Sequence, residues 1–120
     1  MSEPDAVRKP STLHEAIEII RAELPEFDLN AWANGEMFEA VMDEHFGLGM
    51  WFRNQWVHGH PAGLARRIRE GVSFCHDDDV SSIILEGIWR ILNGEDGVTA
   101  EVLIDERTRP NRDPKREADA

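Results

Sequence analysis

"DDDVSSIILEGIWRILNG", residues 77–94, is the stretch that decides the fold of this 120-residue chain. Its apolar residues recur at spacings of three and four, which predicts a helix over residues 79–93 with one wide buried face. That face consists of Val80, Ile83, Ile84, Gly87, Ile88, Ile91 and Leu92, and Leu85 and Trp89 widen it. Asp77, Asp78 and Asp79 stand at its start, where one acid can cap the helix and the others favour its dipole. A helix that is apolar over so much of its circumference is expected to be central.

Other helices are expected on both sides of this stretch. Thr12 and Glu15 form the capping-box pattern that opens a helix, so we expect the first one over residues 12–24. It should pack on the central helix through Ile17, Ile20, Ile84 and Ile88. Shorter helices are expected over residues 36–46, within 48–57 and over 61–70, where Pro61 suits a first turn and Gly71 a terminus.

Residues 98–104 are ambiguous. Val98, Ala100, Val102 and Ile104 alternate as in a strand, but no second strand is evident for pairing, so strand and helix both stay open and we expect an extended segment. The predicted fold class is mainly α, a compact bundle of about four to five short helices with one C-terminal extended segment. The polar ends, residues 1–10 and 107–120, are expected to be mobile tails around a single domain over residues 11–106.

Composition narrows the classes of partner. The formal net charge is −11, which disfavours direct contact with nucleic acid or with an anionic membrane and suits a basic protein surface; solubility alone explains it almost as well. The chain has one cysteine, so it can form no internal disulfide. No signal-peptide run and no apolar stretch of membrane-spanning length is evident, and the expected location is the cytoplasm.

"HFGLGMWFRNQWVHGH", residues 45–60, concentrates aromatic and histidine side chains. Phe52 and Trp56 would share one helix face and are expected in the core, with Trp51 beside them. Arg53 and Asn54 lie inside this aromatic run and are predicted to be structural polar residues. A guanidinium there needs an acceptor, and the cluster of Asp77 and its two neighbours is the expected partner. The alternatives are a structural ion pair and a site for an anion.

Metal and catalytic sites are weakly indicated. His58, His60, Cys75 and His76 are residue types that bind zinc, but their spacing matches no strong zinc motif. The sequence contains no phosphate-binding glycine loop, nucleophile elbow or His-Glu-x-x-His motif, so we expect neither an enzyme nor a cofactor. The alternative hypothesis is a small enzyme or metal-binding protein that uses Arg53, His58, His60 and Asp78.

Three segments together resemble a known family. They are "PSTLHEAI" (10–17), "HFGLGMWFRNQW" (45–56) and "DDDVSSIILEGIWRILNG" (77–94), and the pattern Gly-x-x-x-Arg-Asn-x-Trp falls on Gly49, Arg53, Asn54 and Trp56. They resemble a family of small domains of unknown function found in bacteria and their phages. The resemblance covers roughly residues 10 to 94 and supports the helical prediction, but it implies no activity.

The function expected from these features is that of a small acidic protein-interaction module. In its sharpest form it is a phage or mobile-element inhibitor that occupies a basic site on a nucleic-acid-handling protein. We expect the partner-binding residues among the acids near both ends of the domain. Like charges three or four residues apart destabilise an isolated helix, so their presence is consistent with a role in binding a partner. These acids are Glu36, Glu39, Asp43, Glu44, Glu101 and Asp105.

Overall fold

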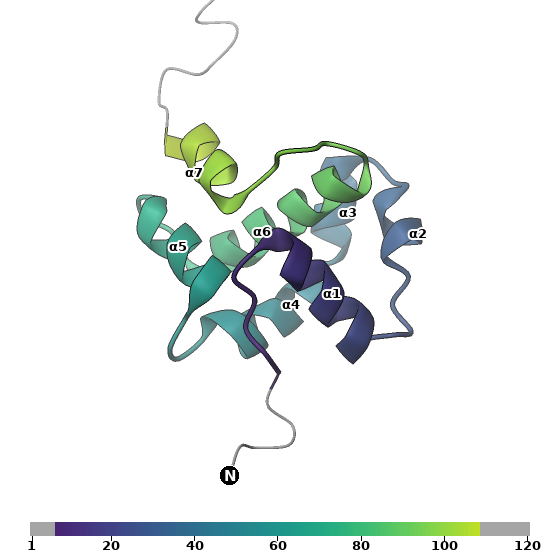
Figure 1. Cartoon of the computed structure of the whole chain (residues 1–120), viewed down its shortest axis with the longest axis horizontal. Coiled ribbons are helices and arrows are strands. Elements are labelled where there is room, and N and C mark those ends of the chain that lie inside the picture. Colours follow the sequence, from purple (N-terminus) through teal and green to yellow (C-terminus); the bar gives the residue numbers. More distant parts are fainter. Residues whose placement is uncertain (1–6, 109–120) are drawn as a thin grey trace, which may run out of the picture.

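Helix α6 (Asp77–Leu92) runs through the middle of the molecule and contacts every other helical element (Figure 1). The computed structural model describes residues 7–108. Around α6 lie α1 (Leu13–Glu23), α2 (Leu29–Ala33), α3 (Met37–Asp43), α4 (Leu48–Phe52), α5 (Gly63–Gly71) and α7 (Ala100–Thr108). The mainly helical fold is confirmed. Residues 7–108 hold seven α-helices, however, and the prediction of four to five was too low because α2 and α7 were not counted as helices.

The core is organised on the apolar face of α6. Ile84 and Ile88 are fully buried, and Ile17 and Ile20 of α1 are buried opposite them, as expected for these two packed helices. Gly87 allows a close approach here, because a Cβ atom added to it would lie 2.8 Å from side-chain carbons of both Leu13 and Leu103. This one glycine therefore brings α1 and α7 onto the same part of α6.

Local capping groups define the starts of the two main helices. The Thr12 hydroxyl accepts a hydrogen bond from the Glu15 backbone N–H at 3.1 Å, and the Glu15 carboxylate accepts one from Ser11 at 2.6 Å. At α6 the Asp79 carboxylate accepts from the His76 backbone N–H at 2.9 Å. The acids therefore do lie at the helix start, but α6 begins two residues earlier than the expected residue 79.

The expected extended segment at residues 98–104 is wrong. Thr99 opens helix α7 there, since its hydroxyl accepts from the Val102 backbone N–H at 3.2 Å. Val98, Ala100 and Leu103 are buried, a spacing that suits a helix docked on α5 and α6. Alternation of apolar residues was misleading because β-branched residues are tolerated in a helix once tertiary packing stabilises it.

Residues 48–57 form one continuous helical segment, as expected. Helix α4 widens into a π-helical turn, η1 (Arg53–Val57), in which the His58 N–H donates to the Arg53 carbonyl at 2.8 Å. Phe52 and Trp56 are fully buried and stack with ring centroids 4.6 Å apart. These two rings fill the space below α6, so the aromatic run is mainly core.

Helix α3 differs from the expected helix over residues 36–46. It ends at Asp43, and only Ala40 in it is fully buried. Its large apolar side chains Phe38 and Met42 are 67% and 55% exposed. The inner face is made by the small Ala40, whose carbonyl accepts a hydrogen bond from the Trp32 indole at 2.8 Å.

Residues 7–10, expected as part of a tail, lie against the domain. The Trp56 indole donates to the Arg8 carbonyl at 3.2 Å, and the Leu64 N–H donates to the Pro10 carbonyl at 2.9 Å. Helix α5 therefore begins at Gly63, beyond the expected Pro61; a side chain at Gly63 would collide with the Pro10 carbonyl. Arg107 and Thr108, expected in the C-terminal tail, form the end of helix α7 (Ala100–Thr108). The rest of the expected tails, residues 1–6 and 109–120, lies outside the described residues.

Candidate functional site

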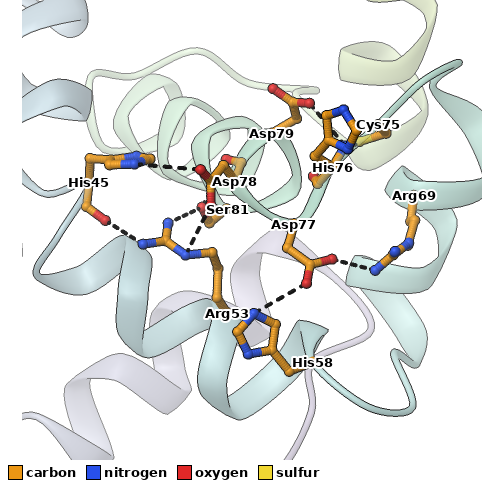
Figure 2. Close-up of polar contacts among 10 residues, drawn as sticks. All are labelled: His45, Arg53, His58, Arg69, Cys75, His76, Asp77, Asp78, Asp79 and Ser81. Atoms are coloured by element: carbon orange, nitrogen blue, oxygen red, sulfur yellow. Dashed lines mark hydrogen bonds and ion pairs between the residues drawn. The ribbon is translucent and has the colours of Figure 1, made fainter.

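Arg53 is the centre of a polar cluster below the N-terminus of α6 (Figure 2). Its side chain is 8% exposed; its guanidinium donates to the Ser81 hydroxyl at 2.8 Å and to the His45 carbonyl at 3.0 Å. Its Nε lies 3.4 Å from Asp78, so the expected contact with the acid cluster is present. Asp78 also lies 3.9 Å from the His45 ring.

The residues around Arg53 explain the Gly-x-x-x-Arg pattern. A Cβ atom on Gly49 would lie 3.0 Å from the Glu44 carbonyl and 3.4 Å from the Arg53 guanidinium, so a glycine lets the chain close over the charge. Asn54, expected as a structural polar residue, is exposed, and its side chain forms no hydrogen bond within residues 7–108. It is the next residue along the helical segment, so its side chain points in a different direction from that of the buried Arg53.

Asp77, another acid at the start of α6, contacts two basic side chains other than Arg53. Asp77 forms an ion pair with Arg69 of α5, and its carboxylate also lies 3.2 Å from the ring of His58 (Figure 2). The proposed catalytic set is therefore divided, with Arg53 on Asp78 and His58 on Asp77. His60 is exposed in the preceding loop and lines a different hollow beside α5.

The histidine and cysteine candidates for metal binding do not converge. No group of three or more His, Cys, Asp or Glu side chains in the described part of the chain is arranged to hold a metal ion. Cys75 is partly buried, and its burial raises the pKa of the thiol, which disfavours the thiolate that a metal would need. Its neighbour His76 instead contributes its backbone N–H to the cap of α6.

The acids near the end of the domain are paired with bases. Glu101 forms an ion pair with Arg67 at 3.0 Å, and Arg90 contacts Glu106 at 2.7 Å and Glu95 at 3.1 Å. Hydrogen bonding to Arg90 lowers the pKa of Glu106. Asp105, the other acid expected to bind a partner there, is half-buried and has interactions within the fold. Much of this negative charge is therefore neutralised internally.

The acids of α3 have a different environment. Glu39 and Asp43 are exposed, and no basic side chain in residues 7–108 pairs with either of them. Glu36 and Glu44 are used as local caps: Glu36 accepts from the Glu39 N–H at 2.8 Å and Glu44 from the Leu48 N–H at 2.9 Å. The expected partner-binding acids thus divide into a compensated C-terminal set and an uncompensated set on α3.

Exposed apolar side chains adjoin these α3 acids, a feature that sequence reasoning missed. Of the five large apolar side chains that the described residues expose, four occur at intervals of four residues from 38 to 50. They are Phe38, Met42, Phe46 and Met50. The regular spacing was visible in the sequence, but a competing apolar set on the same helix, with Met37 and Val41, could equally have been the inner face.

A cavity of about 640 Å³ opens between the end of α1 and the start of α4. Leu24, Phe27, Leu48 and Trp51 supply its apolar lining, and Glu23, Glu26 and Glu44 its charge; Pro25 and Gly47 complete it. Trp51 is half-buried and meets Trp56 edge to face at 5.3 Å. The cavity was not predicted, because its walls are separated by some 20 residues of chain and only folding brings them together.

Comparison with known proteins identifies the family of this domain but gives no activity for it. No helix within residues 7–108 is long and apolar enough to cross a membrane. No curated protein and no solved structure matches the chain. A family model described as a domain of unknown function matches residues 9–92, which includes the Gly49–Arg53 pattern and all of α6 but not α7. This chain belongs to that family, DUF6794.

Proposed function

We propose that the protein is a non-enzymatic interaction module that binds a basic protein surface through the outer face of α3 and the segment after it. The observation that carries this proposal is the acidic and apolar surface of residues 38–50. Phe38 and Met42 lie one turn apart, with Glu39 and Asp43 one turn apart beside them. We call Phe38, Glu39, Met42 and Asp43 the α3 face.

The charge and the apolar content of the α3 face indicate the chemistry of its partner. Exposed apolar side chains that cluster within one segment are typical of interaction surfaces. Unpaired carboxylates beside them favour a partner that carries lysine or arginine next to apolar groups, and they also raise the association rate. Basic surfaces of this kind are common on proteins that handle nucleic acid, which supports an inhibitor or adaptor role. In its sharper form, the proposal is a phage or mobile-element inhibitor; the sequence resemblance bears only on that origin and not on inhibition.

The enzymatic alternative has less support. The donors of Arg53 go to Ser81 and His45, and Asp78 is engaged by Arg53 and lies near His45. This arrangement satisfies a buried charge and links η1 to α6, so a structural role accounts for it.

Partner capture with charge-reversed protein tests the proposal. We expect the immobilised chain to capture a basic protein from native lysate at about 0.1 M salt and to lose it near 1 M, where the Debye length falls from about 10 Å to about 3 Å. The double substitution Glu39→Lys and Asp43→Lys should abolish capture at the lower salt concentration.

The matched control reverses two other exposed acids, Glu18 and Asp96, which have no ion pair in the described residues. This Glu18→Lys, Asp96→Lys variant has the same net charge as the α3 variant and should keep the captured protein. Capture that both variants lose equally would indicate general electrostatic attraction. Capture that neither salt nor the α3 reversal changes would contradict the proposal.

A further inference from the structure

The cavity between α1 and α4 has the composition of a site for an organic cation. Its lining contains three carboxylates, from Glu23, Glu26 and Glu44, and no basic side chain. Its apolar part includes the indole of Trp51. A negative rim over an aromatic surface favours a flat or elongated cation with an aliphatic stem, because the stem is desolvated on the apolar part while the charge meets the carboxylates.

Trp51 differs from the other tryptophans of the chain. The indole N–H groups of the other three donate to backbone carbonyls: Trp32 to Ala40, Trp56 to Arg8 and Trp89 to Gly35. Trp51 makes no such bond within residues 7–108, although its ring meets the ring of Trp56 in a T-shaped arrangement. Three tryptophans thus use the indole N–H in a hydrogen bond within the fold. Trp51, which lines the cavity, has no such bond in the described residues.

The position of Glu44 links the cavity to the α3 face. Glu44 directly follows α3, and its carboxylate is held in place by the hydrogen bond from Leu48. A Cβ atom on Gly47 would lie 2.5 Å from the Glu44 carboxylate oxygen, so a glycine makes room for this conformation. Arg21 lines an adjoining hollow, which shares Pro25, Glu26 and Phe27 with the cavity, and there it donates to Asn30 at 3.4 Å. Within residues 7–108, no lysine or arginine forms an ion pair with any of the three carboxylates of the cavity.

We propose that this cavity receives an arginine side chain of the partner. The inference rests on the proposed function, because the basic partner supplies the arginine. Arginine fits better than lysine for two reasons. Its planar guanidinium can lie against the Trp51 ring, and its paired N–H donors match a carboxylate such as Glu26.

Titration of the full chain with small blocked peptides tests the cavity without the partner. The probes are Gly-Arg-Gly, Gly-Lys-Gly and the neutral isostere Gly-citrulline-Gly, and the readout is the set of tryptophan indole N–H resonances in ¹H–¹⁵N spectra. The Trp51→Phe variant identifies the Trp51 resonance. We expect Gly-Arg-Gly to shift this resonance with an affinity on the order of millimolar, and to leave the other three unchanged. The citrulline peptide should produce no shift.

Two exposed carboxylates can be removed without disturbing the packing, because Glu23 and Glu26 are exposed and make no ion pair in the described part of the chain. The double substitution Glu23→Gln and Glu26→Gln should weaken binding of Gly-Arg-Gly by on the order of fivefold. The matched control Glu18→Gln and Asp96→Asn removes the same charge elsewhere and should bind as the unaltered chain does.

The outcomes separate this inference from the proposed function. An unshifted Trp51 resonance, equal binding of the citrulline or lysine peptide, or equal losses in the two glutamine variants would each overturn the arginine site. If capture still depends on the α3 face in that case, the proposed function stands without it. If Gly-Arg-Gly binds as expected but capture is insensitive to the α3 reversal, the cavity is supported and the proposed function is wrong.

Discussion

Arg53 shows how one residue can hold two helices in position. Its buried guanidinium joins the Ser81 hydroxyl of α6, the His45 carbonyl and the exposed Asp78 carboxylate. Ser81 itself is fully buried and donates to the Asp78 carbonyl at 2.9 Å. Without Arg53, the buried Ser81 hydroxyl and the part-buried His45 carbonyl would lose this donor, so the cluster is more costly to lose than a surface ion pair.

We therefore expect Arg53→Met to lower the free energy of unfolding by about 1–3 kcal/mol, because methionine fills the space but leaves the acceptors of Ser81 and His45 unsatisfied. Urea denaturation at neutral pH measures this change. The exposed neighbour Asn54 gives the control, and Asn54→Ala should change stability by less than about 0.5 kcal/mol. An Arg53→Met protein as stable as the unaltered chain would show that the cluster has no structural role.

At the scale of elements, α7 is fastened to α6 by ion pairs as well as by apolar packing. Arg90 of α6 has only 15% of its side chain exposed and contacts Glu106 of α7, while Arg107 of α7 contacts Glu86 of α6 at 2.7 Å. Hydrogen bonding between Arg90 and Glu106 raises the pKa of Arg90 and lowers that of Glu106. These pairs compensate for the weak amphipathic pattern of α7, whose sequence alone resembles a strand.

The lowered pKa of Glu106 implies a definite dependence on pH. A carboxyl whose pKa is lower in the folded state stabilises that state fully above its unfolded pKa, about 4.3, and loses the contribution as pH falls through the folded value. Glu106→Gln should therefore cost up to about 1 kcal/mol near pH 7, a small loss because Glu106 is 45% exposed and solvent screens the pair. In urea denaturation, the difference from the unaltered chain should shrink as the pH falls below the unfolded pKa and should vanish below the folded pKa. A difference that persists unchanged in acid would rule out the ion pair as its cause.

At the scale of the whole molecule, stability depends on a single core around α6. Every helix contacts α6, and the buried cluster runs from Leu13 of α1 to Leu103 of α7. No second core is present within residues 7–108. The domain is therefore expected to unfold as one cooperative unit.

Ile84→Ala tests this expectation, because Ile84 is fully buried near the middle of α6. The substitution should cost about 2–5 kcal/mol, a large part of the stability of a small domain, and should shift fluorescence and circular dichroism transitions together. Met42→Ala on the exposed side of α3 is the control and should have little effect on stability. Separate transitions by the two probes would instead indicate independently stable parts.

The local pattern of the sequence determined the helices with strong apolar stripes and clear caps. Thr12, Glu15 and the acids at residues 77–79 lie at helix starts, and Phe52 with Trp56 forms the expected buried pair. The pairing of Arg53 with the acid cluster was also predicted from the sequence, because a charge in an aromatic run needs a partner and Asp77 to Asp79 are the densest group of acids in the chain. Such features depend on residues within a few helical turns, or on the need of a buried charge for a partner.

Tertiary structure decided the features that depend on which of two possible faces is buried. Residues 98–104 became a helix because α5 and α6 offered a surface for Leu103, and Phe38 and Met42 became exposed because the small Ala40 faces the core instead. Tertiary packing also determined which acids are paired with bases. Arg67, for example, reaches Glu101 only because α5 and α7 pack together. The Trp51 cavity likewise exists only where α1 meets α4. The physical reason is that burial and charge compensation are set by contacts between distant segments, and local propensity is too weak to choose among them.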